Sequence, residues 1–352
     1  MAVGGVLGAA GAARSGVVSR LARREHGDDR PASAAPDVAP PPRDGRGPTA
    51  KAPKPSRRAY RLGRGEPAGE GLRRIAIGRL DHAGDQLGGD GDPAEAVHEA
   101  RKDLKKLRAV LRLLRSRIGK QLYRRENTEL RDMGRLLATS RDAQVRLDTL
   151  DALVGSGAVE ADAVAPLRAQ LEQERDAIAT PARGDPSAAT RIAAAADRVR
   201  GWPVGGDGWD AIEPGLRRSY RRGGARMRDA IADPTVERLH EWRKRVKDLW
   251  YHLRILTPAW PAVIEALAEE AHLLSEQLGD DHDLAMLGTA ARERAGAFAD
   301  PGELDALLDA IDRRRSELQH AATSLGRRLY ADEPGAFVSR AEVWWRAWRG
   351  PA

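Results

Sequence analysis

The sequence predicts an all-α protein built from two pseudo-symmetric four-helix units, and three observations support this prediction. Residues 97–114, VHEARKDLKKLRAVLRLL, recur as residues 239–256, LHEWRKRVKDLWYHLRIL, so that His98 corresponds to His240 at a fixed offset of 142 positions. In both segments the apolar residues recur every three or four positions, which is the spacing of an amphipathic helix. Aromatic residues are only 4% of the chain, and Ala, Leu, Arg and Glu dominate, as in helical proteins.

The expected helices follow the chain as two matching series. The first series comprises residues 68–87, a helix opened by Pro93, and residues 121–139, 140–150, 159–178 and 188–199. The sequence GWPVGGDG then marks a joint, so we expect a first half of about residues 67–200 and a second of about 208–349. The second series comprises residues 209–231, a helix capped by Asp233 and Pro234, one ending at Leu278, one opening near Asp280, and residues 301–329 and 334–348. The simplest arrangement of the two halves is a helical domain with a pseudo-twofold axis.

Composition limits the class of protein. The 352 residues are 41% hydrophobic, which is enough for a substantial core, and contain no cysteine, which excludes disulfides, thiolate nucleophiles and cysteine-bound metals. No window reaches the roughly 18 apolar residues of a membrane span, and residues 1–13 lack the basic start of a secretory signal. We therefore expect a cytoplasmic protein with no membrane partner.

The charges are sorted along the chain. Residues 1–66 hold 13 Lys or Arg against 6 Asp or Glu, which accounts for the whole formal net charge of +7. This segment is rich in Pro, Gly and Ala, a composition typical of a disordered tail. In the rest of the chain, residues 93–118 carry eight Lys or Arg and three acids, whereas residues 261–283 carry seven acids and no Lys or Arg. This segregation indicates a polyanion-binding surface.

A stripe of cations runs beside the apolar seam of each repeated helix. On the first helix it comprises His98, Arg101, Lys105, Arg108, Arg112 and Arg115, and on the second His240, Arg243, Lys247, Trp250 and Arg254. Like charges four residues apart destabilise a helix by a few tenths of a kcal/mol per pair, so we expect a bound anion to offset the cost. If the two units pack symmetrically, both stripes face one basic groove, which Arg221 and Arg222 on the preceding helix would extend.

Other chemistry is poorly supported. The motifs HEARK and HEWRK begin like the zinc motif HExxH, but Lys102 and Lys244 stand where the second histidine is needed. Residues 280–283, DDHD, precede an apolar helical run and are best interpreted as a helix cap rather than a metal site. The sequence contains no GxxxxGK[ST], no GxGxxG after a strand and no GxSxG. We expect no catalytic residue, no metal and no cofactor.

The two repeated helices, the turns LATSRDAQVR and LGDDHDLAML, and the closing LYADEPGAFVSRAEVWWRAW resemble the CHAD family, the conserved histidine α-helical domain. The resemblance covers about residues 67–349. It implies two four-helix halves around a basic central cavity that binds inorganic polyphosphate without catalysis. The ligand-facing positions that it implies are His98, Arg101, Lys102, Lys105, Arg108 and Arg112 in the first half, and His240, Arg243, Lys244, Lys247 and Arg254 in the second.

We therefore predict a non-catalytic polyphosphate-binding module that could target itself or a partner to polyphosphate granules. A nucleic-acid-binding or regulatory protein using the same cations is the alternative, but the first stripe lacks interleaved aromatic residues on which bases could stack. A phosphohydrolase is a third alternative, and it lacks metal-binding carboxylates among the cations. Trp250 and Asp248 replace Arg108 and Lys106 of the first repeat, so the second half should grip its ligand less strongly. Protonation of the two histidines should strengthen binding from pH 8 toward pH 6.

Overall fold

The all-α prediction is confirmed by the structure, a computed structural model that describes residues 56, 58–137, 141–178, 187–206 and 208–350. Within these residues the chain forms helices and their connections, and no strand. None of the described helices combines the length and hydropathy that crossing a membrane requires. The disorder expected for residues 1–55 falls outside the described residues, whereas residues 58–66 already pack on the helices and Leu62 is buried.

The helices lie close to the positions that periodicity predicts. In chain order they are α2 (Ala68–Gly88), α3 (Pro93–Leu113), α4 (Arg115–Ile118), α5 (Lys120–Leu136), α6 (Arg141–Gly155), α7 (Ala161–Ile178), α8 (Ser187–Arg200), α9 (Glu213–Ala232), α10 (Val236–Leu256), α11 (Pro261–Glu293), α12 (Pro301–Leu329) and α13 (Pro334–Arg349), with short 3-10 turns at Trp209–Ala211, Thr257–Ala259 and Ala295–Ala297. The two repeated segments are therefore α3 and α10. Pro93 opens α3 as expected, behind Asp92, whose carboxylate accepts a hydrogen bond from the Glu95 amide at 2.8 Å.

Two expectations about helix ends are wrong. The N-cap of α10 is Thr235, whose hydroxyl accepts from the Arg238 amide at 3.3 Å, and not Asp233 with Pro234. Residues 280–283 cap no helix, because they lie inside α11, which is 33 residues long and unbroken. The acidic run is tolerated inside α11 because buried Asp281 accepts from Arg315 Nε at 3.1 Å and Gln319 Nε2 at 2.7 Å on α12.

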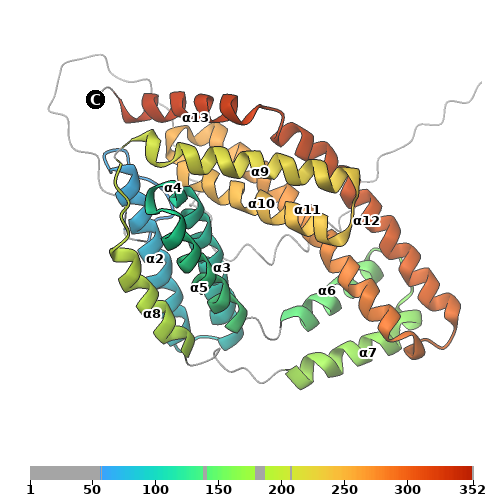
Figure 1. The fold of residues 1–352 in the computed structure, drawn as a ribbon. Coiled ribbons are helices and arrows are strands. Elements are labelled where there is room, and N and C mark those ends of the chain that lie inside the picture. The colour runs from blue at the N-terminus through green and yellow to red at the C-terminus, as the bar shows by residue number, and fades with distance from the viewer. Residues whose placement is uncertain (1–55, 57, 138–140, 179–186, 207, 351–352) are drawn as a thin grey trace, which may run out of the picture.

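Helices α2, α3, α5 and α8 pack together at one end of the molecule, and α9 to α13 form the long upper side (Figure 1). The pairing order of the two series is the same. Helix α2 contacts α3 and α8 as α9 contacts α10 and α13, and α3 contacts α5 as α10 contacts α11. The order is that of a duplicated unit, and the pseudo-twofold relation between the halves stays a prediction.

The α6–α7 hairpin packs away from the other first-half helices. It lies against the far ends of α11 and α12 (Figure 1), where it builds a second apolar cluster. Leu147, Leu150 and Leu167 from the hairpin meet Leu287 and Ile311 there. The hairpin thus joins the two halves of the sequence without approaching the crossing of α3 and α10.

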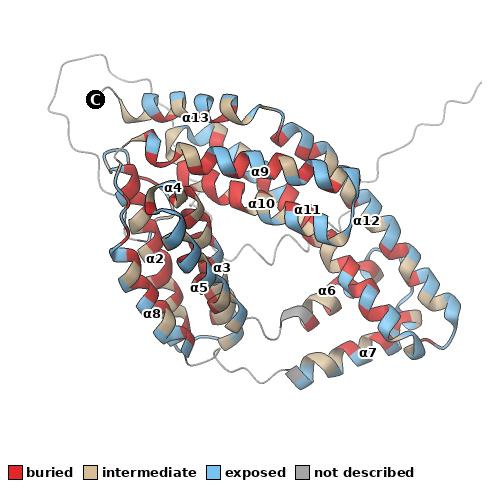
Figure 2. Ribbon diagram, in the orientation of Figure 1, coloured by how far each residue is buried: buried red, intermediate tan, exposed pale blue. Residues whose placement is uncertain are grey.

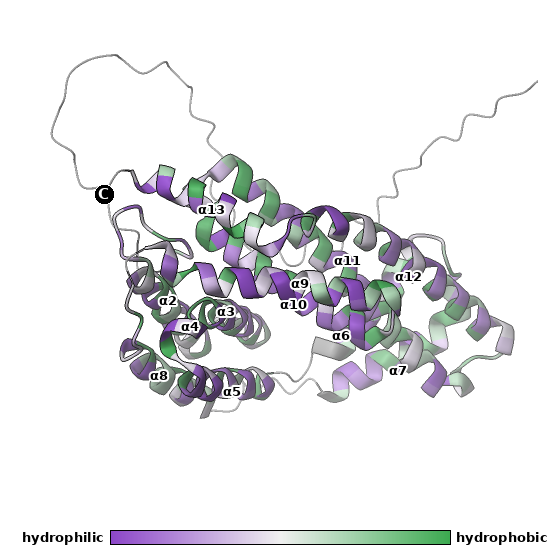
Figure 3. Ribbon diagram, turned by 45° about the horizontal axis from the view of Figure 1, so that its top comes forward, coloured by the Kyte–Doolittle hydropathy of each residue, from purple (hydrophilic) through white to green (hydrophobic). Residues whose placement is uncertain are grey.

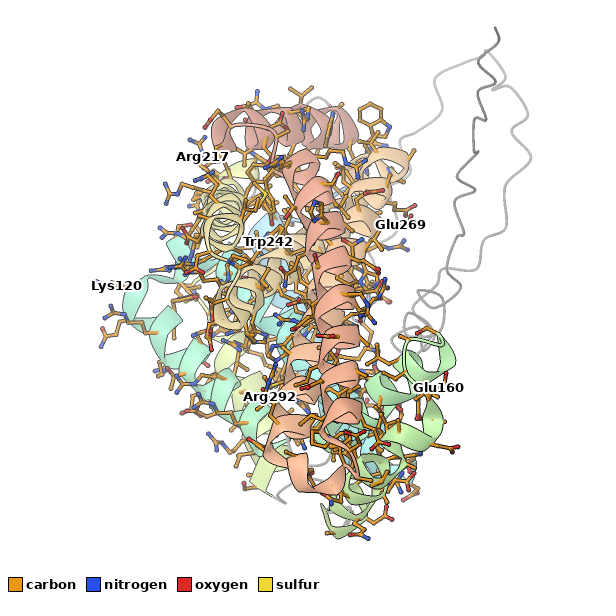
Figure 4. The ribbon with its side chains drawn as sticks, turned by 90° about the vertical axis from the view of Figure 1, so that its right-hand side faces the viewer. Lys120, Glu160, Arg217, Trp242, Glu269 and Arg292 are labelled. Atoms are coloured by element: carbon orange, nitrogen blue, oxygen red, sulfur yellow. The ribbon has the colours of Figure 1, made fainter. Side chains whose placement is uncertain are left out.

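The main core lies between the repeated helices and their neighbours. The apolar seams of α3 and α10 are buried apart from Val97, which has intermediate exposure (Figure 2); their residues are Val97, Ala100, Leu104, Leu107, Leu111 and Leu114 on α3, and Leu239, Trp242, Val246, Leu249, Leu253 and Leu256 on α10. Hydrophilic residues cover outer turns of α5 and α9 (Figure 3). Trp242 on α10 lies behind α12 (Figure 4), packed on Gly326 so closely that a Cβ there would approach its indole to 2.4 Å. At the crossing itself, buried His252 Nε2 lies 2.9 Å from the Ala109 carbonyl oxygen and donates its proton to it.

Candidate polyanion-binding site

Helices α3 and α10 meet through a buried carboxylate beside their crossing point. Asp248 of α10 is 7% exposed, and its two oxygens form ion pairs with Arg112 Nη1 of α3 at 3.1 Å and with Arg245 Nη1 of α10 at 2.9 Å. Arg245 is one turn before Asp248, so helix geometry alone brings these two together. Arg112 comes from the other repeat, and the pair therefore links the two halves of the sequence.

Two further arginines interact electrostatically with the same carboxylate. Arg108 of α3 donates from Nε to Asn127 Oδ1 of α5 at 3.3 Å. Burial first, and then the nearby Arg112, lower the pKa of Arg108 from 12.5 to about 10. Arg222 on α9 is exposed at its surface, yet the partial burial of its guanidinium, followed by the charge of Arg245, likewise lowers its pKa.

Four arginines from three helices are here named the arginine cluster: Arg108, Arg112, Arg222 and Arg245. Arg112 and Arg245 pair with Asp248, and the charge of Asp248 also acts on the other two. A lowered arginine pKa means that the charged form is disfavoured where it stands. An anion arriving at this place would relieve that penalty. The electrostatics of the cluster therefore suit a negatively charged ligand.

Only part of the predicted set lies in this cluster, namely Arg108, Arg112 and Arg222. Lys105 is exposed on α3, and His98, Arg101 and Lys247 are partly exposed along the same two helices. Arg221 is exposed on α9, about 100° around the helix from Arg222.

Lys102 and Lys244 are held by their own motif. Lys102 Nζ donates to Glu99 Oε1 at 2.7 Å, and Lys244 pairs in the same way with Glu241. Each pair spans three residues of one helix, so it follows directly from the repeated spacing HExxK. These two lysines are already partly neutralised, and their contribution to a site is correspondingly smaller.

The second-half residues Arg243 and His240 lie against α11. Arg243 Nε donates to the Ser275 carbonyl at 3.1 Å, and its guanidinium covers Gly279, where a Cβ would lie 2.5 Å from Nη2. The His240 ring lies 4.5 Å from that of His282. Both of these residues therefore contact α11.

The environment of His240 changes the expected pH dependence. Burial, followed by the neighbouring His282 ring and the charge of Lys244, lowers its pKa from 6.5 to about 4. The imidazole of the free protein is thus neutral throughout pH 6 to 8. The expectation that histidine protonation strengthens binding from pH 8 toward pH 6 stays a prediction, and for His240 it requires the bound anion to raise this lowered pKa.

Arg254 lies under an aromatic cover. Its guanidinium carbon is 5.8 Å from the ring centroid of Tyr60 and 5.5 Å from that of Trp250. Trp250 in turn stacks on His272 at 4.2 Å with an interplanar angle of 5°. Trp250 therefore packs against both Arg254 and His272, and Arg254 keeps intermediate exposure.

Arg245 was not among the predicted site residues, because it lies off the predicted stripe. A signal was nevertheless present, because the repeat inverts charge at two positions. Arg245 corresponds to Asp103, and Asp248 corresponds to Lys106. A position that carries a cation in one repeat and an acid in the other indicates a contact that only one half of the protein makes. The described residues contain no group of three or more His, Asp or Glu that could hold a metal ion.

The comparisons with known proteins agree with this architecture. The family model for the CHAD domain matches residues 74–292. The CHAD domain from the plant Ricinus communis has a similar structure, with a TM-score of 0.51 and 20% identity over 79% of this chain and 96% of that one. PptA from Streptomyces chartreusis gives a TM-score of 0.53 and 18% identity over 76% of this chain and 100% of that one. No curated protein matches the sequence. With the family model covering more than half of its length, the chain belongs to the CHAD domain family.

Proposed function

We propose that this protein binds inorganic polyphosphate without catalysis and that the arginine cluster is the centre of its binding site. The observation that carries the proposal is that Arg112 of α3 and Arg245 of α10 pair with Asp248, while Arg108 and Arg222, from α3 and α9, interact electrostatically with the same group of charges. Family membership supports the same conclusion. The cytoplasm remains the expected location, and targeting to polyphosphate granules is the biological use that we propose.

The chemistry of the cluster favours a flexible linear polyanion. Guanidinium groups donate several hydrogen bonds each and bind phosphate oxygens without reading any base. Polyphosphate presents closely spaced charges, so adjacent phosphates can meet Arg108, Arg112 and Arg222 in turn. Each phosphate bound releases counterions, which makes the affinity depend steeply on salt.

Two observations argue against the other functions considered. A single-strand binder needs aromatic faces for its bases, but the ring of Tyr123, an aromatic residue near the cluster, already has the Arg115 guanidinium 4.7 Å from its centroid. A metal-dependent phosphohydrolase needs carboxylate oxygens available to a metal. Both oxygens of Asp248 are engaged, by Arg112 and by Arg245.

The test is a titration of the full chain with long-chain polyphosphate at several salt concentrations, beside single- and double-stranded DNA of equal phosphate count. The variant Arg108→Gln/Arg222→Gln carries the site perturbation. The variant Arg175→Gln is its control, because Arg175 lies on α7, remote from α3, and pairs with Asp176.

We expect tight polyphosphate binding that survives DNA competition, weakens with salt, and falls at least tenfold in the double variant but not in the control. Equal or tighter binding of DNA would favour the nucleic-acid alternative. Release of phosphate by the purified protein would revive the phosphohydrolase. Wild-type affinity in the double variant would place the binding site elsewhere.

A further inference from the structure

An exposed aromatic surface lies where the start of α11 meets α13. Trp260, the residue just before α11, is 47% exposed, although tryptophan is highly buried on average. Its ring centroid lies 5.5 Å from that of Trp344 on α13. Val343, the neighbour of Trp344 in the chain, is 65% exposed. These three residues, here named the tryptophan patch, present apolar area to solvent, which in a folded protein marks a surface for interaction.

The patch has a shape that the core does not require. Trp344 packs on the main hydrophobic cluster, whereas Trp260 is not part of that packing among the described residues. The two indole planes stand at 82° to each other and so form an apolar corner rather than a flat stack. The Arg340 guanidinium carbon lies 5.5 Å from the Trp344 ring centroid, and Arg340 is itself paired with Asp332. The open part of the corner is therefore provided mainly by Trp260.

Aromatic surfaces of this kind suit proline-rich segments. Proline rings pack on indole faces, and a run of prolines is already held in the polyproline II conformation, so little conformational entropy is lost when it binds. The chain carries such a run itself. Eight of its 21 prolines lie in residues 31–55, and residues 40–42 are three consecutive prolines followed by Arg43. These residues lie outside those that the structure describes.

The segment before α2 is tied to the end of α10. Arg74 of α2 donates to the Ser56 carbonyl at 3.2 Å and to the Arg61 carbonyl at 2.8 Å, so a single guanidinium holds both. The next residue, Leu62, donates from its amide to the Ile255 carbonyl at 3.2 Å. Ser56, where the described chain begins, is therefore held close to the end of α10.

The proline run is within reach of the tryptophan patch. Trp260 is five residues beyond Ile255, and five residues span at most about 19 Å. Pro42 and Ser56 are 14 positions apart in the chain. An extended chain of that length spans up to about 46 Å, which exceeds the distance to be crossed.

A carboxylate near the patch matches the arginine that follows the prolines. Glu265 is exposed on the second turn of α11 and makes no ion pair with any residue that the structure describes. It is five residues after Trp260, about 7.5 Å along the helix axis. Residues 261–283 hold seven acids and no Lys or Arg, so this part of α11 attracts a cation. An acid beside the aromatic corner would set the direction in which a proline run ending in Arg43 binds.

We propose that the tryptophan patch binds residues 40–42 of the same chain and that Arg43 pairs with Glu265. The inference concerns a surface other than the arginine cluster and does not depend on polyphosphate binding. Docking holds the N-terminal region against α11 and α13. It also occupies the surface that proline-rich segments of other proteins would use.

The test uses the full-length protein, which has no cysteine, so that two introduced cysteines report docking without background. Protein carrying Ala39→Cys and Ala262→Cys, next to the proline run and to Trp260, is treated with a short bismaleimide at low protein concentration. The matched control pair is Ala39→Cys with Ala169→Cys, because Ala169 is exposed on α7, far from α13 (Figure 1). We expect cross-linking within one chain to be at least about fivefold faster in the first pair, because docking raises the effective concentration of the two thiols.

Substitutions on both sides of the contact separate docking from chance encounter. Trp260→Ala, and separately Pro40→Ser/Pro41→Ser/Pro42→Ser, should lower the rate to that of the control pair, while Trp260→Phe should retain it. Glu265→Arg should also slow the reaction, and adding Arg43→Glu should restore it by exchanging the two charges.

Thermal unfolding establishes that each variant is folded, and the triple proline variant serves if Trp260→Ala does not fold. Equal rates in the two cysteine pairs would overturn the inference. So would a fast rate that survives loss of the three prolines. Products that join two chains instead of one would also overturn it, because they would assign the patch to a second copy of the protein.

Discussion

Replacing Arg108 by glutamine should stabilise the free protein while weakening its ligand binding. The pKa of Arg108 is lowered from 12.5 to about 10, by burial first and by Arg112 second. Folding therefore makes protonation of this side chain less favourable than it is in the unfolded chain. At neutral pH Arg108 is protonated in both the folded and the unfolded protein, so the full cost of holding its charge in the folded state is present. This cost corresponds to at most about 3 kcal/mol of unfolding free energy.

Part of this gain is lost again in the variant. Glutamine forfeits the hydrogen bond to Asn127 and the packing of the arginine stem, each worth about 1 kcal/mol. We therefore expect the free energy of unfolding to rise by about 1 kcal/mol, seen as a melting temperature higher by roughly 2 to 4 °C. The polyphosphate affinity should fall about tenfold, since one charge-assisted hydrogen bond to phosphate is removed.

Calorimetric unfolding tests the predicted rise in stability, and a polyphosphate titration on the same preparations tests the predicted fall in affinity. Arg175→Gln controls for the loss of an arginine from the surface, and we expect no change in affinity from it. A variant of Arg108 that is less stable and binds normally would refute the reasoning, because it would mean that the charge is compensated inside the protein and is not available to a ligand.

Three further predictions concern the fold that positions the cluster. The pKa of buried His252 is lowered from 6.5 to about 4, so the unfolding free energy should fall as the pH drops from about 6.5 toward 4, and His252→Gln should flatten that profile in urea titrations. Gly326→Ala should lower the free energy of unfolding by about 1 to 3 kcal/mol in urea, because the added Cβ would overlap the buried Trp242 indole. An unchanged stability would contradict the close packing. Asp281→Ala should lower the free energy of unfolding by about 2 kcal/mol or more in the same measurement, because Arg315 loses its carboxylate partner. Wild-type stability would show that the ion pair contributes nothing.

Periodicity was sufficient to predict most of the helices. The spacing of three and four apolar residues is a local property, and Pro at the first position marks starts such as those of α3, α12 and α13 without knowledge of the fold. The ends that failed depended on tertiary contacts. Asp281 looks like a cap in sequence, and only its pairing with Arg315 and Gln319 on α12 explains why α11 continues through it.

The site was predictable where one helix determines the geometry and not where several meet. Arg108 and Arg112 fall on one helical stripe, which the sequence displays directly. Arg245 joins them only because α10 crosses α3, and that crossing is set by packing. Arg254 has the same place in its own repeat as Arg112, yet it lies under Tyr60, a residue from a segment that composition assigned to the tail.

The crystal structure of the full chain with a polyphosphate of defined length tests the central claim most directly. We predict phosphate density within hydrogen-bonding distance of the guanidinium groups of Arg108 and Arg222, with Asp248 still held by Arg112 and Arg245. Density that contacts other residues and leaves the arginine cluster without phosphate, in crystals grown at saturating ligand, would contradict the account.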